Sequence, residues 1–297
     1  MGYWKRLRSG LAVSALLVCG LQGQGVQLAV SPLRAGDPTL PRRIPDSVRQ
    51  APVPVPFSAG PLSSAEARVH RRGPLVQTGV RRALPAAALA NPNVSISPEG
   101  RAILTLSLRS PGATRLRLHF RGFHAGAGEV WVFGPADRTA FGPYTADGIS
   151  GSGEFWAAGV DGDEIVVAYL APPGSTPSGF PFTLDSLVHV WPAAAATKDP
   201  AAPCNLDVTC YADYKTAAAA VVEYEFLADD GTGAYTCSGA MINTRTSSHR
   251  PYLLTAHHCI SSNTEAQSIQ ASFLYQTAAC NGPAPSLSSV PTVLGGT

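Results

Sequence analysis

The sequence has few charged residues and almost no net charge. Only 14% of its 297 residues are Asp, Glu, Lys or Arg, and the formal net charge is +2. Proteins dedicated to nucleic-acid binding concentrate basic residues on one face. This composition argues against that class of protein, and we expect no nucleic-acid partner.

The sequence also lacks an apolar run long enough to cross a lipid bilayer. Residues 11–21 are apolar, but this stretch is only about half of the roughly 20 residues that a spanning helix needs. Lys5, Arg6 and Arg8 precede it, an arrangement typical of a cleaved export signal. We therefore expect a signal peptide over residues 1–24, secretion to the extracellular space and no stable membrane anchor.

Patterns that hold metal ions are missing as well. The sequence contains no HExxH segment and no CxxC pair, and a zinc site needs three or four ligands that converge on one point. His257 and His258 are adjacent, so their side chains point to opposite faces when the backbone is extended. We expect no metal site and no cofactor.

Glycine and proline, by contrast, are abundant, with 29 and 26 residues. They divide residues 91–191 into short segments in which apolar residues recur at alternate positions, which indicates β-strands. In RLRLHF (residues 115–120), the leucines and the phenylalanine fall on one face and the arginines and the histidine on the other, which predicts a half-buried strand. We predict an all-β chain with a β-sandwich over residues 91–191.

Two stretches without apolar periodicity flank this sandwich. Residues 25–90 are rich in proline and arginine, and we expect a disordered leader there. Residues 192–203 combine alanine and proline without a large apolar anchor, which is typical of an exposed linker that proteases cut. Lys198 lies in this linker, and we predict proteolytic processing at this residue.

Residues 204–297 have a second set of strand patterns. AAVVEYEF (219–226) and YTCSGAMI (235–242) each predict a strand, and the turn between them contains Asp-Gly, a strong hairpin signal. Five of the six cysteines also lie in this part of the chain. Clustered cysteines in an exported protein usually form disulfides, and because five is odd, at least one lacks a partner within this chain.

LLTAHHC (253–259) contains the candidate catalytic residue. A serine hydroxyl is a poor nucleophile at neutral pH and needs a base whose pKa lies near ambient pH, as that of histidine does. The imidazole must also be held rigidly, with one nitrogen facing the serine and the other facing a carboxylate. Nucleophilic hydrolysis is therefore the chemistry that this segment favours.

CSGAMI (237–242) followed by PYLLTAHHC (251–259) resembles the trypsin/chymotrypsin superfamily of serine proteases. CNLDVTC (204–210), the TAHHC form and FLYQTAAC (273–280) resemble, more narrowly, the secreted bacterial lysyl endopeptidases. The resemblance implies an enzyme that hydrolyses peptide bonds in protein and peptide substrates, with lysine as the family's preferred side chain. Lysine is rare in this chain, which suits self-sparing by such an enzyme and equally suits a genome that favours arginine.

The resemblance also implies the roles of single residues. His258 would be the catalytic base, and His257 would take the place of a small residue and point away from the nucleophile. The implied disulfides are Cys237–Cys259 and Cys210–Cys280, while Cys204 would pair with a missing cysteine downstream.

The chain departs from the family pattern after the histidine. In these proteases the order is histidine, aspartate and then serine, but no aspartate and no GDSGGP-like segment follow His258. GISGSG (148–153) comes before the histidine and lacks the proline, so it predicts a Gly/Ser turn. We expect the catalytic aspartate and serine beyond Thr297, so that this chain alone is inactive.

These observations predict the N-terminal fragment of a secreted serine endopeptidase precursor, or zymogen. A propeptide β-sandwich would precede the first, incomplete β-barrel of a chymotrypsin-like catalytic domain over residues 204–297, and the propeptide would pack on that domain. The alternative is a secreted, non-catalytic β-sandwich binding or adhesion protein with a degenerate protease-like tail.

Overall fold

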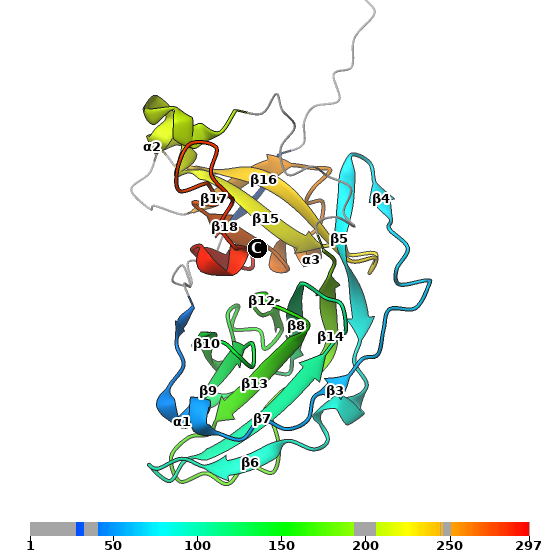
Figure 1. Ribbon diagram of the computed structural model, residues 1–297, viewed down its shortest axis with the longest axis vertical. Helices are drawn as coiled ribbons and strands as arrows, with labels where there is room; N and C mark the ends of the chain where they lie inside the picture. Colours follow the sequence, from blue (N-terminus) through cyan, green and yellow to red (C-terminus); the bar gives the residue numbers. More distant parts are fainter. Residues whose placement is uncertain (1–27, 33–40, 193–205, 244, 246–250, 297) are drawn as a thin grey trace, which may run out of the picture.

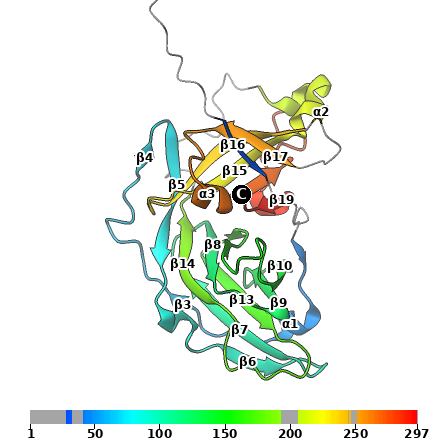
Figure 2. The same cartoon turned by 180° about the vertical axis from the view of Figure 1, so that it is seen from behind.

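The computed structural model describes residues 28–32, 41–192, 206–243, 245 and 251–296. The chain is mostly β, which confirms the predicted all-β class. Figures 1 and 2 show two parts, one above the other. We call residues 41–192 the N-terminal unit and residues 206–296 the C-terminal unit.

The N-terminal unit is a sandwich of two sheets with short connections. Its elements are β2 (Arg42–Arg43), α1 (Asp46–Gln50), β3 (Phe57–Ser58), β4 (Arg71–Arg72), β5 (Leu75–Ala83), η1 (Ala86–Leu89), β6 (Asn93–Ile96), β7 (Ala102–Arg109), β8 (Arg115–Arg121), β9 (Gly126–Phe133), β10 (Thr139–Ala146), β11 (Phe155–Trp156), β12 (Val160–Asp161), β13 (Glu164–Leu170) and β14 (Thr183–Val190). One sheet has the order β2-β10-β9-β13-β7-β3, and the facing layer contains β8, β14 and β5. Alternate residues of these strands, such as Leu106, Leu118 and Val167, form the core between the layers.

The C-terminal unit forms an incompletely closed barrel from consecutive antiparallel strands. Its elements are η2 (Val208–Cys210), η3 (Ala212–Tyr214), α2 (Lys215–Ala218), β15 (Val221–Leu227), β16 (Ala234–Ile242), β17 (Tyr252–Ala256), α3 (Asn263–Gln267), β18 (Gln270–Phe273), η4 (Leu287–Ser289) and β19 (Thr292–Leu294). β15 pairs with β16 and β18, and β16 pairs with β17. A further strand, β1 (Leu28–Pro32), pairs with β17.

The sequence predicted a disordered leader over residues 25–90, but residues 41–90 contain regular structure that packs on the sandwich. Ile44 and Val48 of the α1 segment lie in an apolar cluster with the outer face of β9 and β13. The buried Arg82 of β5 donates hydrogen bonds to the backbone oxygens of residues 59–61. These hydrogen bonds replace the sheet pairing that the proline-rich sequence does not provide.

The face of β8 predicted to meet solvent is buried as well. Arg115, Arg117 and His119 are all less than 8% exposed. Arg117 donates to Glu225 of β15 at 3.2 Å and to the backbone oxygen of Ser268 at 3.1 Å, and Arg115 also pairs with Glu225. The C-terminal unit covers Arg115 and Arg117, while Trp156 of the N-terminal unit stacks on His119. The alternating pattern predicted the strand correctly but not what packs on its polar side.

β5 joins the two units in one continuous sheet. Its C-terminal half pairs with β14, while Gln77 and Gly79 pair with Tyr235 and Ala234 of β16. At Gly79 an added Cβ atom would lie 2.7 Å from the backbone oxygen of His189, so the close approach of β14 requires glycine. The sheet that β5 completes has the order β11-β8-β14-β5-β16-β15-β18-β19.

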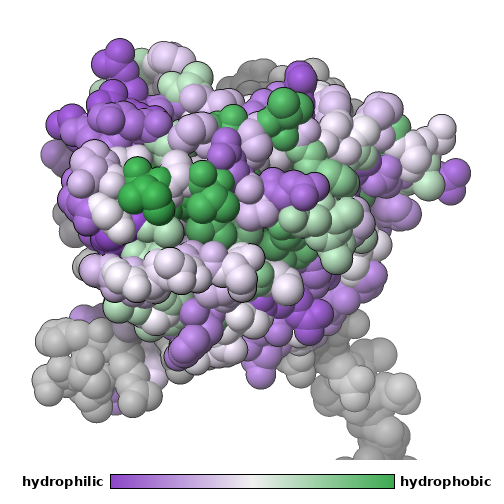
Figure 3. All heavy atoms as spheres, turned by 90° about the horizontal axis from the view of Figure 1, so that it is seen from below, coloured by the Kyte–Doolittle hydropathy of each residue, from purple (hydrophilic) through white to green (hydrophobic). Residues whose placement is uncertain are grey.

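None of the helices in the described ranges is long and apolar enough to cross a bilayer. The end of the N-terminal unit in Figure 3 shows hydrophobic side chains as separate spots among polar ones.

His189 of β14 is a histidine whose neutral form is favoured by its burial. The Ser110 hydroxyl accepts from Arg82 at 2.8 Å and is hydrogen-bonded to Nδ1 of His189, also at 2.8 Å. Burial, followed by the charge of Arg82, lowers the pKa of His189 from 6.5 to about 4.

Replacing Glu225 with Gln should destabilise the chain strongly. Two buried guanidinium groups would lose their shared counter-charge, and breaking a buried ion pair in this way costs about 3–5 kcal/mol. Denaturant unfolding measures the change in the free energy of unfolding. Asp163→Asn, at the more exposed Arg109–Asp163 pair, is the control and should cost under about 1 kcal/mol. Equal losses in the two variants would contradict the prediction.

The free energy of unfolding should fall as the pH decreases from about 6.5 to about 4, partly because of His189. Its folded-state pKa is lowered, so the unfolded chain binds a proton in this range that the folded chain does not. In His189→Asn the side-chain amide can replace Nδ1 as the hydrogen-bond partner of Ser110 but does not titrate. Unfolding curves at several pH values should show a shallower pH dependence for this variant than for the wild type. The same slope in both proteins would refute the role of His189.

Candidate active site

His258 lies on a tight turn directly after β17. β17 ends at Ala256, and the backbone oxygen of Ala256 accepts hydrogen bonds from the amides of Cys259 at 3.0 Å and Ile260 at 3.2 Å. His257 and His258 are both exposed, whereas Cys259 and Ile260 are buried. The turn thus presents the His258 imidazole to solvent on a backbone fixed by its neighbours.

The pairing of β16 with β17 sets the position of this turn. Ala240 lies opposite Leu254, and Met241 lies opposite Leu253. At Gly239, an added Cβ atom would lie 2.6 Å from the Leu253 side chain and 3.0 Å from the backbone oxygen of Leu254. The glycine of CSGAMI therefore allows the two strands to approach closely.

A disulfide attaches the His258 turn to the neighbouring strand. Cys237 of β16 is bonded to Cys259, with 6.3 Å between the Cα atoms. This is the bond that the resemblance implies. By closing a loop with a sequence separation of 22, it restricts the motion of the residue next to His258.

A buried hydroxyl network lies below the turn. Thr255 donates to the backbone oxygen of Ser238 at 3.3 Å and is hydrogen-bonded to the hydroxyl of Tyr224. Burial raises the pKa of Tyr224 to about 12, so its hydroxyl stays protonated and available as a donor. The threonine of LLTAHHC therefore links β17 to both β15 and β16.

The sulfur atoms next to His258 are not available as ligands for a zinc ion. Within the described ranges, three possible ligands converge at Cys237, His258 and Cys259, with their atoms within 4.8 Å of one another. The two sulfur atoms are bonded to each other in the disulfide. Zinc binds the thiolate form of cysteine, which a disulfide does not offer.

A short helix follows the turn and holds its far end. Ser262 caps α3 by accepting a hydrogen bond from the amide of Glu265 at 3.2 Å. The Glu265 carboxylate accepts from the amide of Ser261 at 2.8 Å and from its hydroxyl at 3.1 Å. The S-x-x-E spacing predicts a helix start of this kind.

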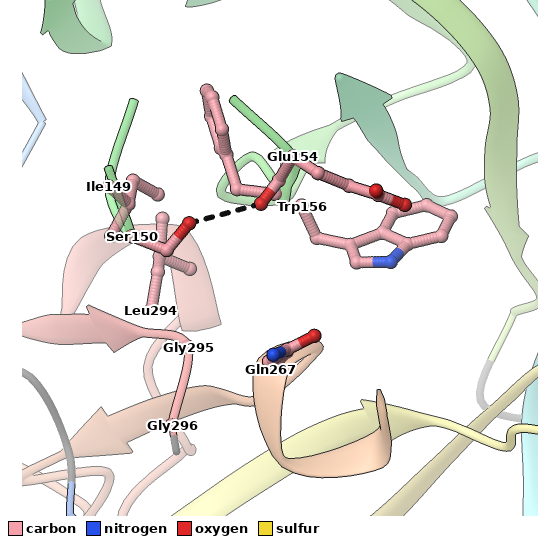
Figure 4. Close-up of a pocket in the computed structure, with 9 residues that line it drawn as sticks. Ile149, Ser150, Glu154, Trp156, Gln267, Leu294, Gly295 and Gly296 are labelled. Atoms are coloured by element: carbon pink, nitrogen blue, oxygen red, sulfur yellow. Dashed lines mark hydrogen bonds between the residues drawn. The ribbon is translucent and has the colours of Figure 1, made fainter. Parts of the chain in front are cut away.

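The partners that a catalytic histidine needs are not found in the part of the chain that the structure describes. No described carboxylate or serine hydroxyl is hydrogen-bonded to His258. Residues 148–153 form a turn, as predicted, and the Ser150 and Ser152 hydroxyls bond to each other and to the backbone oxygen of Glu154. In Figure 4 this turn lies over Leu294 at the junction of the two units.

Asp207 is an organising residue that the sequence did not reveal. Its carboxylate accepts from the amide and hydroxyl of Thr209, from the Thr277 hydroxyl at 2.7 Å and from the Asn281 amide at 2.7 Å. The hydrogen bond from Thr277 is the largest of the effects that lower the pKa of Asp207 to about 2. Beside this network Cys210 is bonded to Cys280, the second implied disulfide. Only the position of Asp207 inside CNLDVTC offered a signal.

Two of the candidate residues from the sequence cannot be placed. Lys198 and Cys204 lie outside the described residues, so their predicted roles remain predictions. Of the other candidate residues, the structure brings together His258, Cys237 and Cys259 at one place and Cys210 and Cys280 at another.

Comparison with known proteins gives consistent matches to both units. The family model described as "Lysyl endopeptidase N-terminal domain" matches residues 56–191, and the one described as "Lysyl endopeptidase, C-terminal domain" matches residues 199–297. A lysyl endopeptidase of Pseudomonas aeruginosa is 26% identical over 252 residues, which cover 77% of this chain and 54% of that protein. The chain thus spans about half the length of this curated relative.

Proposed function

The chain belongs to the lysyl endopeptidase family, and from this we infer that it is the N-terminal part of a secreted serine endopeptidase precursor. The observation that carries the proposal is the exposed His258 on a disulfide-bound turn, within the residues that match the family's C-terminal domain. The substrates are proteins and peptides, with cleavage after lysine as the family name suggests.

In the proposed reaction His258 acts as general base and then as general acid. Its imidazole takes the proton of a serine hydroxyl while the serine oxygen attacks the carbonyl carbon of the scissile peptide bond. The same proton then passes to the leaving amine, and a water molecule, activated in the same way, releases the acyl group. The disulfide to Cys237 and the network of Thr255 and Tyr224 hold the backbone turn that carries the imidazole.

The other catalytic groups belong to the downstream part of the precursor in this proposal. The serine, the carboxylate that orients His258, the oxyanion hole and the side-chain pocket would all lie there. Residues 1–24 would direct export, and the N-terminal unit would be the propeptide. The buried contacts of Arg115 and Arg117 with Glu225 support its packing on the catalytic domain.

Processing at Lys198 should give a mature form that begins at Asp199. N-terminal sequencing of the secreted protein measures this directly. Lys198→Arg should slow or prevent the cleavage, because a lysine-specific site would be lost, while Lys215→Arg serves as the control and should leave it unchanged. A mature form that begins well away from Asp199 would show that the linker is cut elsewhere.

The chain of 297 residues should not hydrolyse lysyl or arginyl ester substrates above background, because an acyl-enzyme cannot form without the serine. In the complete precursor after processing, His258→Ala should lower kcat by about a thousandfold or more, whereas His257→Ala should retain most of the activity. Turnover by the present chain that His258→Ala abolishes would refute the assignment. A complete protein without His258-dependent activity would favour the non-catalytic binding protein.

A further inference from the structure

The β4–β5 hairpin extends from the N-terminal unit to the part of the C-terminal unit that carries His258. Arg72 pairs with Leu75 across a tight turn in which Gly73 has a φ of +55°. In Figures 1 and 2 the upper end of β5 lies beside the C-terminal unit, close to α3. Both ends of this turn, Arg72 and Leu75, contact the C-terminal unit.

The guanidinium group of Arg72 lies in an acidic and aromatic site. It forms an ion pair with Glu265, whose side chain is 0% exposed, and donates to the Ser261 hydroxyl at 3.0 Å. Its central carbon lies 5.8 Å from the centre of the Phe226 ring, within the range of a cation–π interaction. The hydrogen bond with Glu265 is the largest of the effects that raise the pKa of Arg72, so this residue is a permanent cation.

Leu75 belongs to the apolar core of the other unit. It is 8% exposed and lies in one cluster with Phe226, Tyr235, Cys259 and Ile260. Burying a leucine in this way stabilises the contact because its apolar surface is removed from water. The hairpin is therefore held by a charge at one end and an apolar side chain at the other.

The residues that receive this hairpin follow His258 directly in the sequence. Cys259 and Ile260 share the cluster with Leu75, Ser261 accepts from Arg72, and Glu265 holds Ser261 through its amide and hydroxyl. The contacts of Glu225, by contrast, lie on β15. The units also meet through the pairing of β5 with β16 and through Asp161, which accepts from Ser286 and Ser288. Of these contacts, those of the hairpin are the ones that reach the segment after His258.

We propose that the C-terminal unit carries a docking site for a tight hairpin turn with an arginine at its first position and a leucine at its fourth. The occupant is Arg72–Leu75 of the same chain. Filling the site immobilises residues 257–261, so the N-terminal unit controls the mobility of the loop that carries His258. When the hairpin leaves, Glu265 keeps only the hydrogen bonds from Ser261 among its described partners, and the cluster around Ile260 loses a side chain.

Hydrogen exchange of the full chain tests the docking site, because local opening sets the exchange rate of backbone amides. Arg72→Gln should accelerate exchange in a peptide covering residues 255–263 by about tenfold or more. Arg71→Gln is the matched control, since Arg71 is the exposed neighbour in the same strand and the change in charge is identical. It should leave exchange in residues 255–263 as in the wild type. A peptide from β13 reports the stability of the sandwich and should exchange slowly in both variants.

Arg72→Lys decides the outcome if Arg72→Gln exchanges rapidly in β13 too, which would indicate global unfolding. Lysine keeps the charge but cannot contact Glu265 and Ser261 with two separate nitrogens, so it should give an intermediate acceleration confined to residues 255–263. Wild-type exchange in residues 255–263 with a protected β13, or an equal acceleration in Arg71→Gln, would overturn the proposal. The measurement needs no turnover, so it stands apart from the peptidase assays.

Discussion

The buried ion pair between Glu225 and the two arginines of β8 is the contact on which the arrangement of the units depends. Arg117 is 0% exposed, and such a charge is tolerated inside a protein only when a counter-charge and hydrogen bonds accompany it. Burial alone raises the pKa of Glu225, but the charges of Arg115 and Arg117 outweigh this effect and lower it. Each unit therefore has charged groups that only the other unit can neutralise, which makes this pairing of the two surfaces specific.

The two units also depend on each other for backbone hydrogen bonds, through β5. One half of the strand completes the sandwich and the other half pairs with β16, so separating the units would leave amide and carbonyl groups of both without partners. The two units thus share one sheet and have charged contacts between them. The consequence for the site is that Arg72 and Leu75 reach the segment following His258.

Residue patterns predicted some features of the candidate site and of the fold around it, and missed others. The alternation in YTCSGAMI predicted a strand, because strand periodicity is a local property. The role of His258 and the bond between Cys237 and Cys259 came from the resemblance to the trypsin/chymotrypsin superfamily. The ordered leader was missed, since residues 41–90 have no apolar periodicity and are held by distant groups such as Arg82 and the sheet face above α1. Asp207 was missed for the same reason: its partners Thr277 and Asn281 lie about 70 residues away.

The sequence by itself determined the all-β class, the strands over residues 115–120, 219–226 and 235–242, and the family to which the chain belongs. Each of these depends on the order of residues within a short window or on a motif. Only the tertiary structure decided which polar faces are buried and what neutralises them. Arg115 and Arg117 look like the solvent face of a strand until Glu225, more than 100 residues later, is brought against them. The physical reason is that alternation distinguishes two faces of a strand, whereas burial depends on the surface that packs against each face.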